Sequence, residues 1–412
     1  MALIFLRIEE HYMRLRTFES FWLVSNGLLN SYPSLHENIS TDIVVLGSGI
    51  TGALMCYELI TAGYDVVLLD KRDVAQGSTS ATTAMLQYEI DMPLYKLKDI
   101  IGEEGAVKCY RAGIDAIIDL GEIISKNNIE CGFETKKSLY VSHNKKASRW
   151  LHEEFKIRDK YKLGVQWLDS KEIESRYGIV SSGGILSDTA ASADAYRLAH
   201  ELISFCVGKG MQVYDHTEVT DIKCTEQGVK LTTEAKNVVA ANKVIFCTGF
   251  ESLKYIDEKI AEIITTYATI SEQNMPLKKA WKETLVWNTD VPYLYARTTD
   301  DGRLLAGGED GRYSTASLSF KTKNKKSERL KKKLKVLVPG IDFIEDFSWA
   351  GAFGRTKDAL PYIGKYSKMP NAFFNLGFGG NGITFSVQGA KMIVKLLQGE
   401  NPELLHYYRF GR

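Results

Sequence analysis

The segment from Asp42 to Asp70 constrains the fold more than any other part of this chain. It begins with the short apolar run Ile43–Leu46, which leads directly into the glycine-rich sequence GSGITG. A helical pattern follows, and a second apolar run, Val66–Leu69, ends at Asp70. A strand, a glycine turn, a helix, a strand and an acid in this order are typical of a dinucleotide-binding unit with a parallel sheet.

Each glycine of this turn has a physical task in holding a dinucleotide. Gly47 makes the tight turn, Gly49 lets the backbone approach a pyrophosphate, and Gly52 lets the helix pack close to the strand. The helix N-terminus offers unpaired N–H groups and a positive dipole end to the phosphates. The Asp70 carboxylate is placed to accept a hydrogen bond from a ribose hydroxyl. The alternative interpretation is a glycine-rich turn that holds no ligand.

The composition is that of an ordinary soluble globular protein with room for two domains. The chain has 412 residues, of which 44% are hydrophobic and 25% are charged. A net charge of +1 gives no argument for nucleic acid as a partner. The six cysteines form no CxxC pair, which favours a reducing, cytoplasmic setting. No apolar run reaches the roughly 18 residues of a spanning helix, so we expect no transmembrane segment.

Hydrophobic periodicity predicts helices and strands in alternation along the rest of the chain. Helices are expected over 103–126, 148–162, 191–207 and 321–335. Short strands are expected between 211 and 249 and between 260 and 310. The strongly basic helix 321–335 is interpreted as amphipathic with a solvated face, and a nucleic-acid or membrane patch is the alternative.

The chain begins with an extension, residues 1–41, that precedes the dinucleotide-binding unit. Its aromatic side chains predict that it packs on the body of the protein. The sequence leaves open whether translation starts at Met1 or at Met13. No repeat or linker separates the domains, so we expect the nucleotide-binding part to be interleaved with a second domain.

Three further segments extend the dinucleotide interpretation to a flavin. The first is VIFCTG at 244–249, a buried strand that ends in a small residue and a glycine. The second is GSTSATTAM at 77–85, whose small and hydroxyl side chains allow the backbone to approach a flat ring or phosphates. The third is NLGFGGNGIT at 375–384, where glycines precede a second helix start. A helix N-terminus near the flavin C2 carbonyl would favour the anionic reduced ring.

With these motifs in this order, the chain resembles the D-amino-acid-oxidase-like family of FAD-dependent oxidoreductases, in its glycine oxidase, sarcosine oxidase and D-amino-acid dehydrogenase branch. The resemblance covers about residues 42–399 and rests on DIVVLGSGITG, VVLLDKRDVAQGSTS, VIFCTG, WAGAFGRTKDALPYIG and NLGFGGNGITFS. It implies an α/β and α+β fold, in which a Rossmann-like FAD-binding domain of the GR2 type is interleaved with a substrate domain on a mainly antiparallel sheet. The FAD-binding domain would comprise 42–90, 150–250 and 345–412, and the substrate domain 91–149 and 251–344.

The resemblance also implies which residues hold FAD. The turn glycines would bind the pyrophosphate, Asp70 and Lys71 the adenosine ribose, and Val219 the adenine through its backbone. The complete implied set is Gly47, Gly49, Ile50, Thr51, Gly52, Asp70, Lys71, Ser78, Thr79, Thr83, Val219, Thr248, Gly249, Gly379, Gly380, Asn381, Gly382, Ile383 and Thr384. Some members attach the flavin through a His near the glycine loop or a Cys in the C-terminal third. Residues 77–85 contain no His and no Cys follows Cys247, so we expect non-covalent FAD.

The activity implied by the resemblance is the oxidation of a small-molecule amine or amino acid. The family removes a hydride from a carbon that bears an amine and passes it to flavin N5, and the imine then hydrolyses. Such a reaction needs the neutral amine placed over the ring, so positioning dominates and no obligatory base is required. None of the seven histidines lies in a signature motif, so the sequence leaves the catalytic residue unknown, and we predict no metal ligand.

Four residues are candidates for contact with the substrate on one side of the flavin. Tyr293, Tyr295 and Arg297 are two positions apart, so they share one face of a strand that can look at the flavin. Tyr293 matches a tyrosine that glycine-oxidase-like members place at the substrate. The alternative is an aromatic pair that fills the packed side of the sheet, with Arg297 at the surface. Tyr88, just after the flavin loop, is a further candidate for the pocket.

The arginines that clamp a substrate carboxylate in small-amino-acid members are replaced in this chain. One of them would stand four residues after the Trp of WAG, where this chain has Phe353. The other would stand just before the Asn-Gly of the glycine cluster, where this chain has Gly380. Arg355 is a further substrate candidate that could replace this clamp, because it keeps the strand face of Phe353, but it stands roughly 7 Å further along the strand. We therefore expect a larger amine, or an amino acid that is held differently.

Two other functions are left open by the sequence. One is FAD-dependent oxidation of a CH–OH substrate such as a 2-hydroxy acid or glycerol phosphate, for which Arg297, Arg355 and Lys357 offer positive charge. The other is a non-catalytic FAD-binding subunit. The sequence does not distinguish an oxidase from a dehydrogenase, and it leaves the electron acceptor open among oxygen, a quinone or another acceptor.

Overall fold

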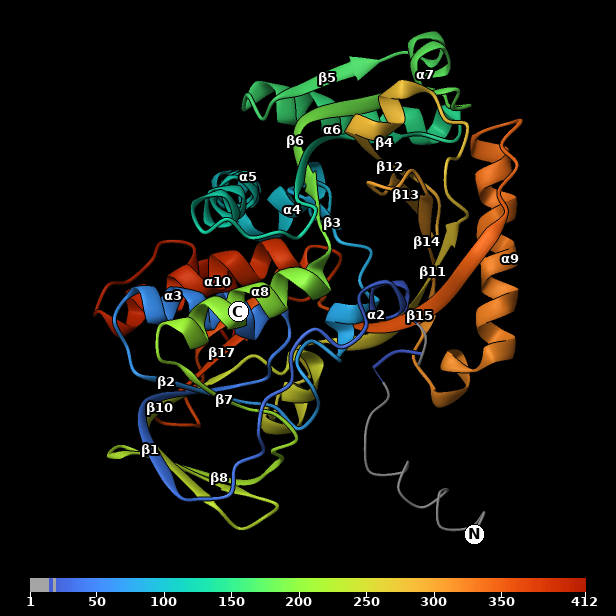
Figure 1. The fold of residues 1–412 in the computed structure, drawn as a ribbon. Helices are drawn as coiled ribbons and strands as arrows, with labels where there is room; N and C mark the ends of the chain where they lie inside the picture. Colours follow the sequence, from blue (N-terminus) through green and yellow to red (C-terminus); the bar gives the residue numbers. More distant parts are fainter. Residues whose placement is uncertain (1–14, 18–19) are drawn as a thin grey trace.

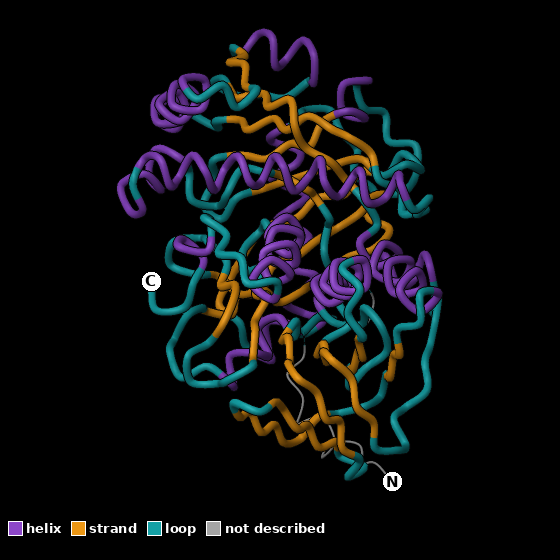
Figure 2. Tube along the Cα trace, turned by 90° about the vertical axis from the view of Figure 1, so that its left-hand side faces the viewer, coloured by secondary structure: helices purple, strands orange, loops and turns teal. Residues whose placement is uncertain are grey.

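The protein is built on two β-sheets with helices between and around them (Figure 1). The structure is a computed structural model that describes residues 15–17 and 20–412, so the choice between Met1 and Met13 lies outside the described residues. Figure 2 shows the two groups of strands from the side, with helices lying between them. This mixed α/β architecture confirms the expected fold class.

The smaller sheet carries the predicted dinucleotide-binding unit, in the strand order β16–β17–β10–β1–β2–β7, with β9 paired to β10 and β8 paired to β9. Its strands are β1 (Ile39–Leu46), β2 (Val66–Leu69), β7 (Gln212–Tyr214), β8 (Val219–Thr225), β9 (Gly228–Thr233), β10 (Val238–Phe246), β16 (Tyr362–Lys365) and β17 (Ala372–Leu376). Strand β1 pairs in parallel with β2 and β10. All four residues of β2 are buried, as expected for a parallel strand covered on both faces.

Three helices pack together over this sheet: α3 (Ile50–Thr61), α8 (Ala195–Gly208) and α10 (Gly382–Leu397) (Figure 1). Helix α3 contacts both α8 and α10, and α5 (Glu103–Lys126) packs against α10 and α4 (Leu94–Ile101). Helix α3 is nearly all apolar, and its Ala53, Met55 and Leu59 have no exposed surface. The carboxyl ends of β1, β2 and β10 meet at one edge, so the loops that follow these strands are brought together.

The larger sheet has nine strands in the order β15–β11–β14–β13–β12–β4–β6–β3, with β5 paired to β6. They are β3 (Met85–Gln87), β4 (Glu134–Val141), β5 (Val165–Leu168), β6 (Gly184–Ser192), β11 (Glu262–Ser271), β12 (Thr284–Asn288), β13 (Leu294–Thr298), β14 (Leu304–Arg312) and β15 (Glu345–Arg355). Its pairings are antiparallel apart from the parallel pair β4 and β12. The sheet is therefore mainly antiparallel, as expected.

Helix α9 (Phe320–Leu337) lies along the outer face of the larger sheet (Figure 1). Its Leu330 and Leu334 have no exposed surface, whereas Lys321, Lys325, Lys332 and Lys335 are exposed. The amphipathic helix predicted over 321–335 is therefore present. The remaining helices are α2 (Phe21–Asn26), α6 (Lys145–Lys160), α7 (Ser170–Tyr177) and α11 (Leu405–Tyr408). Within the described residues, no helix combines the length and apolar character needed to cross a membrane.

The described part of the N-terminal extension runs along the edge of the larger sheet. Residues 15–17 lie beside β15, where the Ala352 N–H donates to the Leu15 carbonyl at 2.7 Å and the Thr17 N–H donates to the Ala350 carbonyl at 3.0 Å. A little further on, the Trp22 indole N–H donates to the Thr82 carbonyl at 2.6 Å. The extension thus packs on the body next to the flavin loop predicted at 77–85.

The sheets do not follow the domain boundaries expected from the sequence. Strands β3, β5, β6 and β15 belong to the larger sheet, whereas the sequence assigned 42–90, 150–250 and 345–412 to the FAD-binding domain. Strand β15 pairs along its whole length with β11, from Glu262 opposite Arg355 onward. The chain therefore crosses between the sheets within each of these segments. The apolar pattern of a strand shows that the strand is buried but not to which sheet it belongs. This explains why the expected domain boundaries differ from the observed sheets.

Candidate functional site

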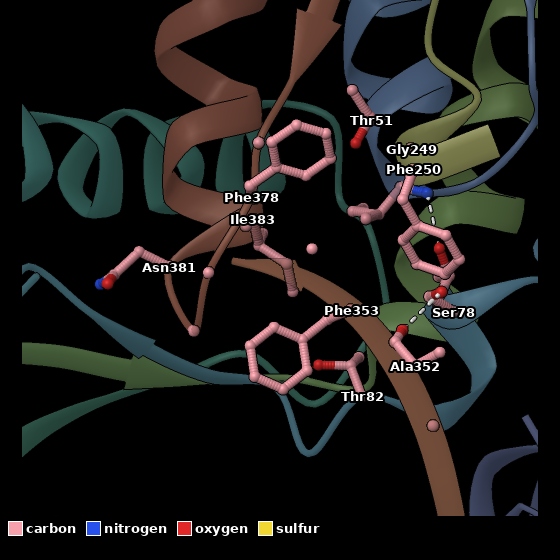
Figure 3. A pocket seen from close by; sticks show the side chains of 18 of the residues that line it. Thr51, Ser78, Thr82, Gly249, Phe250, Ala352, Phe353, Phe378, Asn381 and Ile383 are labelled. Carbon is pink, nitrogen blue, oxygen red and sulfur yellow. Dashed lines mark hydrogen bonds between the residues drawn. The ribbon is translucent and has the colours of Figure 1, made fainter. Parts of the chain in front are cut away.

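A cavity of about 570 Å³ opens where the loops at the carboxyl edge of the smaller sheet face the larger sheet (Figure 3). Every residue predicted to contact FAD lines this cavity except Gly52. The lining also includes Tyr293 just before β13, Tyr295 of β13 and Phe353 of β15. Figure 3 shows Phe353, Phe378 and Ile383 around the space. The fold thus joins the dinucleotide turn to the face of the larger sheet in one continuous site.

The glycine turn between β1 and α3 is too tight for any other residue. Gly47 has φ of 99°, and a Cβ there would lie 2.7 Å from the Cys247 carbonyl oxygen. A Cβ at Gly52 would lie 1.8 Å from the Gly47 carbonyl oxygen, and one at Gly49 would lie 2.9 Å from Thr79 Oγ1. Gly52 therefore supports the turn from beneath, because it lets α3 sit against Gly47.

Asp70 at the end of β2 is held in place by the backbone around it. Its Oδ2 accepts hydrogen bonds from the Ser48 N–H at 2.7 Å and the Ser48 hydroxyl at 2.8 Å, and its Oδ1 accepts from the Arg72 N–H at 2.9 Å. The neighbouring Lys71 and Arg72 form ion pairs with Glu251 at 2.8 and 3.0 Å. The carboxylate of Asp70 is thus fixed in orientation at the end of the cavity where a ribose is expected.

The flavin loop at 77–85 is fastened on both sides. Thr79 Oγ1 accepts the Ile50 N–H at 2.9 Å, which ties the loop to the first turn of α3. On the other side, the Ser78 hydroxyl donates to the Ala352 carbonyl of β15 at 3.2 Å (Figure 3). The loop therefore bridges the two sheets at the middle of the cavity, with Thr83 in its lining.

A second helix N-terminus faces the cavity at the C-terminal glycine cluster. Helix α10 begins after Asn381, whose side chain does not cap it but donates to the Gln87 and Glu89 carbonyls at 2.9 Å each. The Gly380 N–H donates to Asp91 Oδ2 at 2.9 Å. The N-cap residues Gly49 of α3 and Asn381 of α10 provide no side-chain cap, so apart from the Ile50 N–H bound by Thr79 both helices present N–H groups and positive dipole ends to the same cavity.

These features fit FAD as the bound group. The α3 turn leaves room only for backbone next to a pyrophosphate, and Asp70 stands at the ribose end. The N-terminus of α10 is placed at the far side, where it can stabilise negative charge on the pyrimidine edge of a flavin ring. Val219, Thr248 and Gly249 line the cavity on the smaller-sheet side, as expected.

Tyr293, just before β13, and Tyr295 of β13 both line the cavity, as their alternation predicted. Their ring centroids are 5.7 Å apart. The Tyr295 ring lies over Gly307 of β14, where a Cβ would come within 2.3 Å of its hydroxyl oxygen. Burial raises the pKa of Tyr295 to about 12. Both phenols therefore stay protonated and neutral at physiological pH.

Three other substrate candidates lie away from the cavity. Arg297 is buried and donates to the Thr83 carbonyl at 2.7 Å and to the Ala193 carbonyl at 3.1 Å, so it supports the flavin loop from behind. Tyr88 is also buried, and its hydroxyl donates to the Leu163 carbonyl at 3.1 Å. Arg355 is half exposed and lies 3.8 Å from Glu262 in an adjoining hollow of about 670 Å³. The expected alternation is confirmed for Tyr293 and Tyr295, which line the cavity. Arg297 instead is buried in the core, where the Thr83 and Ala193 carbonyls accept its hydrogen bonds.

Several acidic residues of the site were missed by the sequence reasoning. Asp91 follows β3 and lines both the cavity and the adjoining hollow. Asp310 stands on β14 beside Tyr293 and Thr266, which line the cavity, but it does not line the cavity itself. Burial raises the pKa of both carboxyls, and that of Asp310 reaches about 6 because the nearby Asp91 charge adds to burial. The sequence GGEDGR, with two glycines before two acids in a strand, was the available signal for an irregular strand there.

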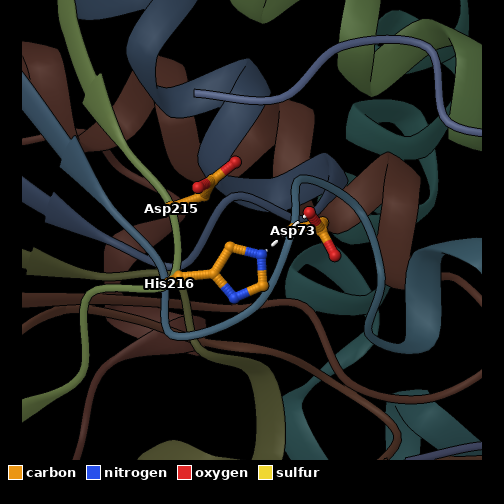
Figure 4. Close-up of side chains that lie close together, drawn as sticks. All are labelled: Asp73, Asp215 and His216. Atoms are coloured by element: carbon orange, nitrogen blue, oxygen red, sulfur yellow. Dashed lines mark hydrogen bonds and ion pairs between the residues drawn. The ribbon is translucent and has the colours of Figure 1, made fainter. Parts of the chain in front are cut away.

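A group outside the cavity brings possible metal ligands together (Figure 4). Asp73, Asp215 and His216 are the members, and His216 Nε2 lies 3.0 Å from Asp73 Oδ1. Asp215 already accepts the Tyr32 N–H at 2.7 Å. These partners account for the arrangement, and we assign no ion to it.

The described geometry agrees with what comparisons with known proteins find. The chain matches the family described as FAD dependent oxidoreductase over residues 42–396. It is 24% identical over 406 residues to gamma-glutamylputrescine oxidoreductase of Escherichia coli (strain K12), covering 92% of this chain and 89% of the relative. It is 24% identical over 377 residues to glycine oxidase of Geobacillus kaustophilus (strain HTA426), covering 87% and 93%.

A solved structure supports the same fold. The crystal structure of glycine oxidase from Geobacillus kaustophilus superposes with a TM-score of 0.75 at 19% identity, covering 90% of this chain and 99% of that one. The family expected from the motifs is therefore confirmed, and FAD is its cofactor. This chain belongs to the D-amino-acid-oxidase-like family of FAD-dependent oxidoreductases.

Proposed function

We propose that this protein oxidises the CH–NH group of a small amine or amino acid. The carrying observation is the single cavity that joins the dinucleotide turn to the aromatic face of the larger sheet. In that arrangement the smaller sheet and its loops hold FAD, and the larger sheet holds the substrate over it. The printed activities of two relatives, a gamma-glutamylputrescine oxidoreductase and a glycine oxidase, are of this class and support the proposal.

When bound, FAD supplies the chemistry by accepting a hydride at N5 from the carbon that bears the nitrogen. The protein's own part is to position the substrate and to exclude water from the site. Tyr293, Tyr295 and Phe353 form an apolar wall over the site, and Trp287 stacks on Tyr140 at 3.5 Å further along it. The N–H groups of α10 face the side where negative charge develops.

No base is required by this arrangement, because the reactive form of the substrate is the neutral amine. Among the described residues that line the cavity there is no histidine. The carboxylates of Asp91 and Asp310 hold a proton more readily than ordinary ones, since burial raises the pKa of each. We assign Asp91, which lines the cavity, to substrate binding. The reducing, cytoplasmic setting inferred from the cysteines is part of the proposal, and all six are free thiols.

The test is anaerobic bleaching of the flavin's visible absorption band. The purified protein is mixed with matched pairs that differ only in nitrogen or oxygen, such as an amino acid and its 2-hydroxy acid, or an alkylamine and the corresponding alcohol. Bleaching by the nitrogen member of a pair, with release of ammonia or an amine, is the expected result. Bleaching by the oxygen member alone would replace this proposal with the CH–OH activity. A protein that keeps its FAD and is bleached by no pair has either a substrate outside these pairs or the role of a non-catalytic subunit.

A further inference from the structure

We propose that the substrate is an amine that carries a flat aromatic group, and that a row of rings formed by Tyr140, Trp287 and Tyr295 binds this group. This inference rests on the proposed function and names the substrate class of the same cavity. It follows from the register of three neighbouring strands, from the direction in which the rings lean, and from the pairing of the charged groups around them.

The row of rings is produced by the strand register of the larger sheet. Trp287 of β12 stands opposite Tyr140 of β4 on one side and opposite Tyr295 of β13 on the other. Residues directly opposite each other on neighbouring strands place their side chains on the same face of a sheet. All three residues line the cavity, so the row of rings lies on the face of the larger sheet that bounds it.

Tyr295 is the member of the row that contacts the flavin loop at 77–85. Its phenol has the Thr83 hydroxyl of this loop as a hydrogen-bond partner. Trp287 and Tyr140 stand one and two strands away from Tyr295, at about 4.8 Å per strand. A ring bound against Trp287 is therefore separated from a carbon held beside Tyr295 by only a short chain.

The indole of Trp287 keeps one face available to a ligand. Tyr140 covers the opposite face, with the ring centroids 3.5 Å apart and the planes inclined by 4°. Tyr295 leans away from Trp287 over Gly307 of β14, where a Cβ would lie 2.3 Å from the Tyr295 hydroxyl oxygen. The Trp287 side chain is accordingly only half-buried. A flat ring between Trp287 and Tyr295 would continue the stack that Tyr140 begins.

Trp150 of α6 adds a further aromatic surface at the Tyr140 end of the row. Its ring centroid lies 5.8 Å from that of Tyr140, with the planes at 66° to each other. Trp150 also lines the cavity and is half-buried. Edge-to-face and offset-stacked contacts are the favoured geometries of aromatic pairs, and this wall offers both to a substrate ring.

The acids near the row of rings already have partners. Glu89 Oε1 lies 3.5 Å from the buried Arg158 guanidinium, and Asp290 Oδ1 lies 2.8 Å from His143 Nδ1. Asp91 accepts the Gly380 N–H at 2.9 Å and is the acid assigned above to substrate binding. The row of rings therefore presents aromatic faces, and the neighbouring acids are neutralised or assigned to the amine.

A charged tail on the substrate finds no built partner at this end. Among the described residues that line the cavity, Arg72 is the only arginine, and it pairs with Glu251 at the nucleotide end. The nearest lysine to the row, Lys96, is exposed to solvent. Phe353 and Gly380 stand where a carboxylate clamp is expected in small-amino-acid members. The lining thus favours an uncharged flat group over a carboxylate.

The experiment compares phenylalkylamines that have one to three methylene groups with their cyclohexyl counterparts and with n-alkylamines that have no ring. Dissociation constants come from anaerobic flavin bleaching of the FAD-loaded protein. A second readout avoids turnover: the N-acetyl derivatives of the same compounds, which are amides and not amines, are titrated by the change in the flavin spectrum.

The variants act on the central ring of the row. Trp287→Leu removes this ring, and Trp287→Phe keeps an aromatic face. The matched control is Trp167→Leu, because Trp167 of β5 is a half-buried tryptophan of the same sheet that does not line the cavity. Unchanged FAD content and visible spectrum show that each variant is folded.

We expect the phenyl compound of best length to bind at least about tenfold more tightly than the ring-free amine, because its ring leaves water. It should bind at least about threefold more tightly than its cyclohexyl counterpart, because only a flat ring stacks. Trp287→Leu removes the preference for phenyl over cyclohexyl in both readouts and leaves the affinity for the ring-free amine nearly unchanged. Trp287→Phe keeps most of the preference, and Trp167→Leu keeps all of it.

Two results would overturn the inference while the proposed amine oxidation stands. One is binding of the phenyl compounds no tighter than that of the cyclohexyl compounds. The other is a preference for phenyl that Trp287→Leu leaves intact, which would place the substrate ring elsewhere in the cavity. Bleaching by hydroxy compounds alone would overturn the proposed function, and the titration with the amides reports on the row of rings separately.

Discussion

The carboxyl of Asp310 is expected to lower the free energy of unfolding in a pH-dependent way, and the size of this effect follows from its pKa. Its pKa rises from the ordinary 3.8 to about 6, mainly because of burial, with Asp91 adding to the increase and Thr266, Tyr293 and Arg355 opposing it. A carboxyl with a raised pKa in the folded state favours folding when protonated, and this contribution is lost as the pH rises through the folded-state pKa. The ionised side chain therefore destabilises the ligand-free protein above about pH 6.

The expected effect of Asp310→Asn depends on pH. A pKa difference of one unit is worth about 1.4 kcal/mol, so the increase from 3.8 to about 6 corresponds to at most about 3 kcal/mol. Asp310→Asn is expected to raise the free energy of unfolding by up to about this amount at pH 8 and by nothing below about pH 4, with the change falling between. Urea unfolding, followed by circular dichroism without substrate at several pH values, measures it.

The matched control is Asp290→Asn. Asp290 lines the cavity and already has partners, His143 at 2.8 Å and the Asn288 amide at 2.8 Å. Its replacement is expected to leave stability unchanged or lower it at every pH. The reasoning about Asp310 is refuted if Asp310→Asn is no more stable than the parent at pH 8, or if the two variants show the same pH dependence.

Three further outcomes are expected. Gly52→Ala places a Cβ 1.8 Å from the Gly47 carbonyl oxygen, so the variant should be purified without the yellow flavin band; full FAD content would contradict the role of this turn. Arg297→Met leaves the Thr83 and Ala193 carbonyls unpaired, and we expect a loss of about 2–4 kcal/mol in urea unfolding with substrate affinity nearly unchanged; the reverse pattern would make Arg297 a substrate residue. Acid precipitation should release all FAD into the supernatant, whereas flavin that stays with the pellet would show covalent attachment.

Local pattern predicted much of this fold. The helix at 103–126 was expected with the bounds that the structure shows, because its apolar spacing continues without interruption between two breaks. The glycine turn could be assigned because only glycine fits the backbone distances found at Gly47 and Gly52. Steric requirements of this kind involve residues that are close in the sequence, so a single sequence is enough to predict them.

The substrate end was harder to predict because it depends on pairing between distant strands. Alternation along the strand correctly predicted that Tyr293 and Tyr295 face the site. The same rule wrongly predicted that Arg297 faces it, because the Thr83 and Ala193 carbonyls bind Arg297 in the core. Asp310 stands beside Thr266 and Tyr293 at an irregularity in the pairing of β14 with β11. Asp91 matters because Gly380, far along the chain, donates to it. No local pattern contains these contacts.

The most direct test of the account is a single anaerobic turnover with a matched pair of substrates that differ only in nitrogen or oxygen. The account predicts that the amine bleaches the flavin completely and that one molecule of ammonia or amine product appears per FAD, while the hydroxy compound leaves the spectrum unchanged. Complete bleaching by the hydroxy compound with no reaction of the amine would contradict it.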